Sequence, residues 1–185
     1  SDVANAVFDG TSAVMLSAET AIGRDPVNVV ATMARLAVRA EQDFDHAAWG
    51  NHLGRQQLVG TSTGSRITAA LSAAAWRAAS DAEVTAIIAC TNSGATARAI
   101  SRFRPTAPII AATPSITTAR QLSVAWGIRP MLVDPQPTTD EIVWFAVQAA
   151  TRAGVVKPDD VVAVLVGSPD EPEPTTDVLR LVRVH

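Results

Sequence analysis

A small polar segment, Thr91-Asn92-Ser93-Gly94, has the residue types and the spacing to bind an anion. It follows an apolar run over residues 85–90 that is short enough for a buried strand, and a helical pattern with Ile100 and Phe103 on one face comes after it. A strand, a polar turn and a helix start in this order direct backbone N–H groups and hydroxyls at one point, which suits a phosphate. The alternative is that Ser93 only caps the helix, and the spacing alone favours this alternative.

The other residues that could do chemistry are isolated from one another. His46 and His52 have no cysteine or carboxylate cluster near them in ligand spacing, so we predict surface histidines on a connecting segment and no metal site. The single cysteine, Cys90, cannot form an internal disulfide and lies in an apolar run. We predict a buried, unreactive thiol in a reducing cytoplasm.

The composition limits the classes of function. With 185 residues and 48% hydrophobic content, the chain can bury a full core and form one to two domains. Its net charge of −3 gives no electrostatic argument for binding to nucleic acid or to an anionic membrane. No apolar run is long enough to span a bilayer, and no signal segment opens the chain. We therefore expect a cytoplasmic protein without nucleic-acid or membrane partners.

The first 45 residues predict a helix, a strand and a second helix. Ser1 or Asp2 caps a short helix that ends near Phe8, and the apolar residues 13–17 predict a short strand. Asp25 followed by proline is typical of a helix start, and the helical spacing continues to about Asp45. Three such elements cannot close a core of their own, so we expect the last piece of a larger α/β unit.

The next stretch, residues 45–64, lacks a hydrophobic period and is rich in glycine and small polar residues, which predicts a linker. A helix follows from Ser65, with one apolar stripe on Ile67, Ala70, Leu71, Ala74 and Ala78. A later helix opens with a capping box, Thr138 with Glu141, and we predict that its inward residues are Ile142, Phe145, Ala146, Ala149 and Ala153.

Apolar runs without polar alternation recur between the helical patterns, at residues 85–90, 107–113, 128–133 and 161–166. Such runs predict a parallel sheet that is covered on both faces. Pro130 places the third of these strands at an edge or a strand start. The last strand, 177–184, follows a connection too short for a crossover helix and should run antiparallel. The predicted fold is a three-layer α/β domain with a mostly parallel five-stranded sheet.

Longer motifs carry a resemblance to a known family. They are SDVANAVFDG at 1–10, VMLSAETAIGRDPVNVVATMA at 14–34, TNSGATARAISRFRPTAPIIAAT at 91–113, and TARQL followed by GIRPMLV. With these motifs the chain resembles the C-terminal part of pyruvate kinase, in which a (β/α)8 barrel precedes an α/β domain. The resemblance implies that residues 1–45 are the final barrel section with strand eight at 13–17, that 46–64 are a linker, and that 65–185 are the regulatory domain.

The same resemblance implies an activity, the glycolytic transfer of phosphoryl from phosphoenolpyruvate to ADP with Mg²⁺ and K⁺, in a homotetramer. Phosphoryl transfer needs cations over the phosphate, carboxylates for the metal and a positioned lysine. In this family earlier barrel strands supply these groups, and the lone lysine of this chain, Lys157, lies beside a proline in a loop. We expect no catalytic or metal-binding residue here, with Glu19 structural and Asp25 a cap, and no activity of the chain alone.

What the resemblance does imply within this chain is an effector site. In many family members the matching loop holds the phosphate of a sugar-phosphate activator, and the residues that fit this pattern, with one polar neighbour, are Thr91, Asn92, Ser93, Gly94 and Thr96.

Two departures from the family pattern bear on the ligand. Ala95 stands where members that respond to fructose bisphosphate often have arginine, and the segment 168–174, which would cover the ligand, carries Asp170, Glu171 and Glu173. Carboxylates there repel a second phosphate. We therefore expect a sugar monophosphate or AMP. The arginines after the loop, Arg98, Arg102 and Arg104, either contribute to this site or form a solvated or interface face.

Three functional interpretations remain open. The chain is a part of pyruvate kinase, a stand-alone phosphate-ligand binding module with the same fold, or a structural part that mediates subunit contacts. Trp144 and Val147, which lie off the predicted inward stripe of their helix, either serve such contacts or are simply exposed. The barrel motifs at 1–10 and 14–34 favour the first interpretation.

Overall fold

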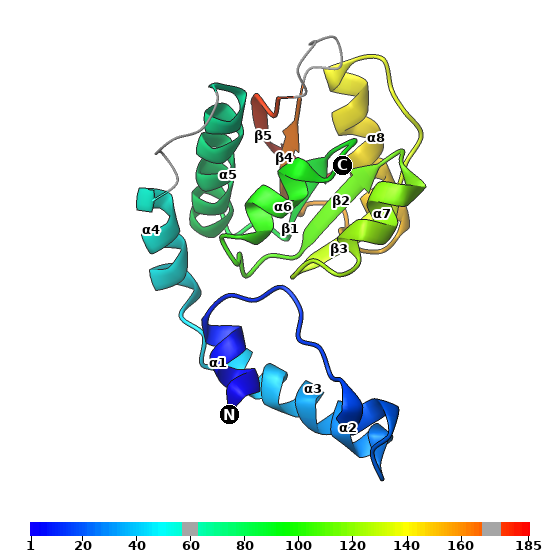
Figure 1. Ribbon diagram of the computed structural model, residues 1–185. Helices are drawn as coiled ribbons and strands as arrows, with labels where there is room; N and C mark the ends of the chain where they lie inside the picture. Colours follow the sequence, from blue (N-terminus) through cyan, green and yellow to red (C-terminus); the bar gives the residue numbers. More distant parts are fainter. Residues whose placement is uncertain (57–62, 168–174) are drawn as a thin grey trace. The chain divides into compact units, whose positions relative to one another are not determined.

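The computed structural model describes residues 1–56, 63–167 and 175–185. Its contacts divide the chain into two units, residues 1–45 and residues 46–185, and each unit is described by itself (Figure 1). No described helix has both the length and the apolar character needed to cross a membrane.

The first unit consists of three helices, α1 (Asp2–Phe8), α2 (Ala18–Ala21) and α3 (Pro26–Gln42), with α1 and α2 both packed on α3. The predicted starts of α1 and α3 are confirmed. The hydroxyl of Ser1 accepts a hydrogen bond from the Ala4 N–H, and the Asp25 carboxylate accepts one from the Asn28 N–H at 3.1 Å. These bonds satisfy N–H groups that a helix start leaves without an intrahelical partner.

The predicted strand at residues 13–17 is wrong. The segment forms no strand in the first unit, all of whose residues the structure describes, and the short helix α2 follows it. A strand requires the N–H and C=O groups of a neighbouring strand, and residues 1–45 contain none. The helix α3 also ends three residues earlier than predicted, at Gln42.

The second unit is built on a five-stranded sheet in the order β3-β2-β1-β4-β5. Its strands are β1 (Ala86–Cys90), β2 (Ile109–Thr113), β3 (Ile128–Leu132), β4 (Val161–Val166) and β5 (Val178–Arg183). The first four strands are parallel, with Ile88 beside both Ile110 and Val164, and β5 pairs antiparallel with β4. The predicted parallel sheet, its antiparallel last strand and the edge position of Pro130 on β3 are confirmed.

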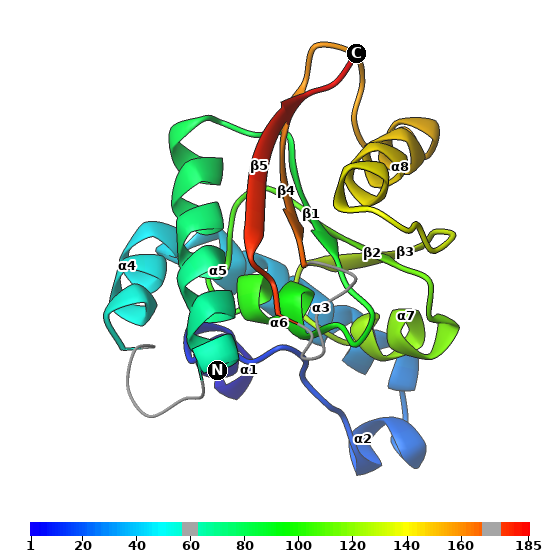
Figure 2. The same ribbon diagram turned by 90° about the horizontal axis from the view of Figure 1, so that it is seen from above.

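Helices cover both faces of this sheet (Figure 2). On one face lie α5 (Thr63–Asp81), α6 (Ala95–Ser101) and α7 (Ile116–Leu122), and α8 (Thr139–Arg152) covers the other face. Successive residues of β1 face opposite layers, so that Ile87 packs with α6 and Ile88 packs with α8. Both side chains are fully buried, as the run of apolar residues predicts.

The linker prediction is wrong for residues 46–56, which form helix α4 (His46–Gln56) in the second unit. Two side chains anchor it: Nδ1 of His46 lies 2.7 Å from the carbonyl oxygen of Arg104, and Nε1 of Trp49 donates to the carbonyl of Arg102 at 2.8 Å. His46 is thus half-buried rather than a surface histidine on a linker. Tertiary contacts stabilise this helix without a clear hydrophobic period.

The buried faces of two helices differ from the predicted stripes. On α5 the most buried residues are Ser72, Ala75 and Ala79, and Ile67 is 40% exposed. On α8 the buried residues are Val143, Ala146, Val147 and Ala150. Val147 therefore belongs to the core and cannot serve a subunit contact, whereas Trp144 is 57% exposed. Alanine recurs on several faces of both helices, so the sequence pattern does not define one apolar stripe.

Candidate functional site

A cavity of about 400 Å³ opens at the carboxyl ends of β1, β2 and β4, beside α8. The chain leaves β1 toward β2 and β3 on one side, whereas β4 lies on the other side of β1. The strands that come next after β1 and β4 in the chain, β2 and β5, thus lie on opposite sides of this pair. Such a switch point in a parallel sheet is where α/β proteins commonly bind ligands.

The loop after β1 forms the polar side of the cavity. Thr91, Asn92, Ser93 and Thr96 all line it, so the structure brings four of the five predicted site residues to one place. Gly94 is buried behind them, with a φ of +82° that a side chain would disfavour.

Local hydrogen bonds hold this loop in shape. The Thr91 hydroxyl accepts from the Gly94 N–H at 2.9 Å, and the Thr118 hydroxyl of α7 donates to the Asn92 carbonyl at 2.7 Å. Arg98 donates through its guanidinium to the Ser93 carbonyl at 2.7 Å. Gly94 is the N-cap of α6, and the Ser93 hydroxyl makes one long bond, 3.4 Å, to the Ala95 N–H. Ser93 is therefore not the cap residue that spacing alone favours.

Thr96 differs from the other loop residues because its hydroxyl is already engaged. The side chain is 5% exposed, and its Oγ1 lies 2.5 Å from Oγ1 of Thr176, which precedes β5. The Thr176 N–H in turn donates to the hydroxyl of Thr68 on α5. Thr68 and Thr176 also line the cavity, and long-range packing rather than any sequence pattern brings them there.

The opposite side of the cavity is apolar and was not predicted. Val133 and Pro135 follow β3, and Ile142 and Phe145 come from the first turns of α8. The predicted inward stripe of α8 includes Ile142 and Phe145, but these two side chains face the cavity instead of the core centre. The sequence did contain one indication of this side of the cavity. Asp134 follows the end of a predicted strand, and binding residues gather at the carboxyl ends of parallel strands.

The three arginines after the loop have separate roles. Arg98 supports the loop backbone, and the Arg102 side chain is exposed. Arg104 is 4% exposed, and its guanidinium carbon lies 4.4 Å from the centre of the Trp126 ring, so it is not part of a solvated face. None of the three lines the cavity, and Asp134 is the one charged side chain among the described residues that do.

Cys90 lies on the cavity floor at the end of β1. Burial raises the pKa of its thiol from 9.0 to about 12. The predicted buried thiol is therefore confirmed, and it stays protonated at neutral pH. A neutral thiol is a poor nucleophile and a poor metal ligand.

The described residues do not fit the metal chemistry that the family implies. In the described parts of the chain no three His, Cys, Asp or Glu side chains are grouped so that they could hold a metal ion. Glu19 accepts a hydrogen bond from the Ser17 N–H, and Asp25 caps α3, so each carboxylate has a structural partner. We derive no catalytic step through Mg²⁺ or K⁺ from these residues.

Comparison with known proteins agrees with this geometry. The family described as "Pyruvate kinase, alpha/beta domain" matches residues 69–182, and "Pyruvate kinase, barrel domain" matches residues 1–30. The chain belongs to the pyruvate kinase family. The pyruvate kinase of Clostridium acetobutylicum is 40% identical over 98% of this chain, and those of Staphylococcus epidermidis and Staphylococcus aureus are 41% identical over the same share.

The pyruvate kinase relatives are much longer than this chain. It spans 37% of the Clostridium protein and 30% of each Staphylococcus protein. Within the family, the sheet of the second unit corresponds to the α/β domain, because the matched range 69–182 covers β1 to β4 and all of β5 except its last residue, Arg183.

Proposed function

We propose that these residues are the C-terminal part of a pyruvate kinase that transfers phosphoryl from phosphoenolpyruvate to ADP, giving pyruvate and ATP. The observation that carries the proposal is the match over 98% of the chain to proteins of that name. The Mg²⁺ and K⁺ of the complete enzyme bind to groups outside these residues. The proposal includes a cytoplasmic location, which is supported by the single cysteine and the resemblance, and a homotetramer, which rests on the resemblance alone.

The assay that tests this proposal compares the 185-residue chain with a longer protein that carries the complete barrel. We expect turnover of phosphoenolpyruvate and ADP by the longer protein only, because phosphoryl transfer needs the metal ligands and the lysine. Turnover by the 185 residues above a blank contradicts the proposed division of roles. No turnover by the longer protein contradicts the proposed activity.

Within this part, we propose an effector site for a monophosphorylated ligand at Thr91, Asn92, Ser93, Gly94 and Thr96. Its support is the cavity beside this loop and the N–H groups at the start of α6. Ala95 gives no fixed cation for a second phosphate, and Asp134 adds a negative charge to the same cavity. Fructose 1,6-bisphosphate should therefore bind more weakly than a monophosphate.

Calorimetric titration with glucose 6-phosphate, AMP and fructose 1,6-bisphosphate tests this site. Ser93→Ala is the sharpest variant, because among the described residues the Ser93 hydroxyl makes only one long hydrogen bond, to the Ala95 N–H. Thr96→Ser is its control, since it keeps the hydroxyl that meets Thr176. Tighter binding of the bisphosphate contradicts the charge argument. Unchanged monophosphate binding in Ser93→Ala removes Ser93 from the site.

The second candidate function is a stand-alone module that binds phosphate ligands. It is supported by the separate core of residues 46–185, which packs on both faces of its own sheet. The two candidates differ in one measurement: a module binds its ligand without affecting any turnover, whereas an effector domain changes the turnover of the complete enzyme.

The exposed Trp144 is the remaining candidate for a subunit contact.

A further inference from the structure

Helix α4 is held against the chain segment that follows α6, residues 102–104, which we call the docking segment. Nε1 of Trp49 donates to the carbonyl of Arg102 at 2.8 Å, and Nδ1 of His46 lies 2.7 Å from the carbonyl oxygen of Arg104. A carbonyl oxygen only accepts hydrogen bonds, so Nδ1 of His46 carries the hydrogen and donates it. Both bonds end on backbone atoms, so they depend on where the docking segment lies and not on its side chains.

The docking segment is itself held in one position. Phe103 has no exposure, and its ring stacks on the Trp76 ring of α5 with centres 6.0 Å apart. The Arg104 guanidinium lies over the Trp126 ring, and the Arg104 backbone has a φ of +51°, which residues other than glycine rarely adopt. Such a conformation persists only where the surrounding structure determines it. Helix α4 therefore binds to a defined surface and must follow that surface if both hydrogen bonds are to be kept.

Helix α6 joins the docking segment to the polar loop. Its N-cap, Gly94, belongs to the loop 91–96, and its C-cap is Arg102. Four of its seven residues are buried, and the Ser101 hydroxyl donates to the Trp126 carbonyl at 2.6 Å. Packed helices shift as rigid bodies rather than deform, so a movement of the loop at one end of α6 reaches the carbonyls at its other end.

The two bonds to the docking segment can have either of two roles. In the first they stabilise α4 and do nothing else, and in the second they also make α4 follow the docking segment when it moves. Helix α4 begins at His46, the first residue of the second unit. A shift of α4 therefore also moves the peptide bond that joins this unit to residue 45. The second role is favoured because both acceptors come directly after the helix that carries the loop.

We propose that His46 and Trp49 form a joint that couples ligand binding at the loop 91–96 to the position of α4, and so to the connection with residues 1–45. They are positioning residues, since neither lines the cavity. This inference rests on the proposed effector site. It goes beyond that site because it names the side chains through which the site acts on the rest of the chain.

The test is amide hydrogen exchange on the 185-residue chain, with and without saturating AMP or glucose 6-phosphate, whose binding calorimetry measures separately. We expect the bound probe to slow the exchange of the α4 amides about fivefold, at the lower end of the range for coupling between two sites. Trp49→Phe keeps an aromatic ring and removes the N–H donor. In this variant the probe should still bind, and the α4 amides should exchange at the same rate with and without it.

Arg102→Ala is the matched control. The Arg102 side chain is exposed and the Trp49 bond ends on the Arg102 backbone carbonyl, so this variant should keep the fivefold effect. A purely stabilising role predicts a different result. In that case Trp49→Phe speeds exchange in α4, but the probe changes nothing at α4 in the native chain.

A measurement without ligand gives an independent readout, because coupling between two sites is reciprocal. The Gly94 amide donates to the Thr91 hydroxyl and should exchange several-fold faster in Trp49→Phe than in the native chain, when compared with the Val164 amide. Val164 of β4 is fully buried in the sheet and reports on unfolding of the whole unit. Equal acceleration of both amides is a general loss of stability and overturns the joint.

The outcomes separate this inference from the effector proposal. Binding of a probe without any change at α4 overturns the joint and leaves the effector site standing. An equal effect of the probe in the native chain and in Trp49→Phe overturns the role of Trp49. If neither probe binds, the effector proposal is wrong, and the comparison of Gly94 with Val164 alone decides whether α4 and the loop are coupled.

Discussion

In the first unit, residues 1–45, the buried apolar side chains are Val7 and Ala40, whereas in the second unit two clusters of buried side chains pack against both faces of a sheet. The first unit exposes Met15 and Ile22 at 87% each and Val27 at 78%. Both regions have helices with well-formed caps, so local structure does not distinguish them. The comparison shows that local hydrogen bonds suffice to form helices, but that a sheet with two covered faces supplies the hydrophobic stabilisation.

Separating the two units is expected to have the largest effect. Residues 46–185 should unfold cooperatively, and residues 1–45 alone should not, because too little apolar surface is buried there. Hydrogen exchange and circular dichroism on the two pieces measure this. Within the whole chain, β1 and β4 amides should exchange far more slowly than α3 amides. Equal protection in both units would contradict the comparison.

The boundary itself can be sharpened with two truncations. The resemblance begins the regulatory domain at residue 65, and the structure adds α4 to this unit through His46 and Trp49. We expect residues 46–185 to have a higher melting temperature than residues 65–185. Equal melting temperatures would mean that the α4 contacts contribute nothing to stability.

A matched pair of substitutions tests the comparison at single residues. Ile88→Ala, at a position with no exposure, should lower the free energy of unfolding by about 2–5 kcal/mol, because it leaves a cavity in the sheet core. Ile22→Ala makes the same chemical change at a side chain that is 87% exposed, and should change it by less than about 0.5 kcal/mol. Denaturant titration measures both, and similar losses would show that Ile22 is buried in solution.

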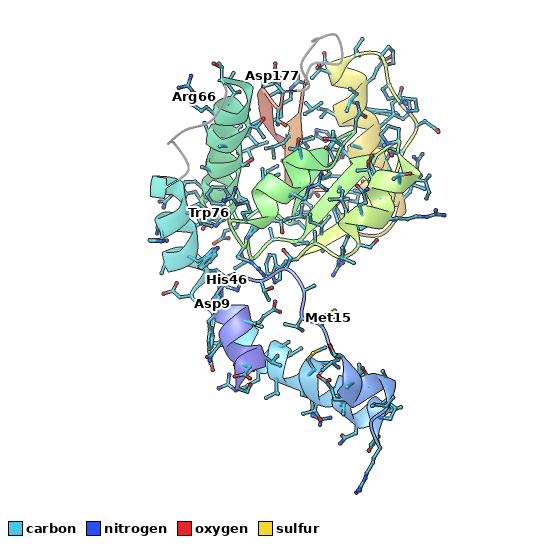
Figure 3. All side chains as sticks on the ribbon, in the orientation of Figure 1. Asp9, Met15, His46, Arg66, Trp76 and Asp177 are labelled. Atoms are coloured by element: carbon cyan, nitrogen blue, oxygen red, sulfur yellow. The ribbon has the colours of Figure 1, made fainter. Side chains whose placement is uncertain are left out.

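Gly50→Ala tests how closely α4 packs on α5. A Cβ at Gly50 would lie 2.2 Å from the Trp76 ring. Trp76 and His46 are both labelled in Figure 3. The substitution should therefore destabilise the fold by about 1–3 kcal/mol, although alanine normally favours a helix over glycine. In a Trp76→Ala background the overlap is gone and the loss should disappear. A stabilising Gly50→Ala in the native background would contradict this packing.

Cys90 should give the smallest effect, seen only at high pH. Its thiol has a pKa of about 12 when folded and 9.0 as a reference, so the unfolded chain loses the proton first. The contribution of this thiol to the free energy of unfolding has its full value below pH 9. It decreases as the pH rises toward 12, by at most about 1.4 kcal/mol per pH unit. The difference between the native chain and Cys90→Ala in denaturant titrations at pH 8 and pH 10 isolates this slope. A pH-independent difference would mean that the folded thiol ionises normally.

The sequence predicts the parts of the structure that depend on residues close together in the chain. The caps at Ser1 and Asp25 and the capping box of Thr138 and Glu141 are confirmed, with the Thr138 hydroxyl donating to the Glu141 carboxylate at 2.7 Å. These bonds join residues three positions apart, so their geometry follows from the helix alone. The strands β1, β2 and β4 are likewise visible as apolar runs, because a doubly covered parallel strand has no polar face.

The candidate site divides in the same way. The polar loop from Thr91 to Thr96 is contiguous, and its spacing after a strand identifies it in the sequence. The opposite wall, with Phe145, and the Thr176 that meets Thr96 come from segments far along the chain. Residues 168–174, which the resemblance places over the ligand, lie outside the described residues. The position of their acidic side chains over the ligand therefore stays a prediction.

The sequence by itself determined the five strands of the sheet, the capped starts of α1, α3 and α8, and the loop after β1, because hydrophobic period and capping act between neighbours in the chain. Only the tertiary structure decided that Val147 faces the core, that residues 46–56 are helical and that residues 13–17 form no strand. In an alanine-rich helix several faces could pack against a sheet equally well. Which face is buried depends on the side chains that the sheet presents. A strand and a helix without a strong period likewise depend on partners that the local sequence does not contain.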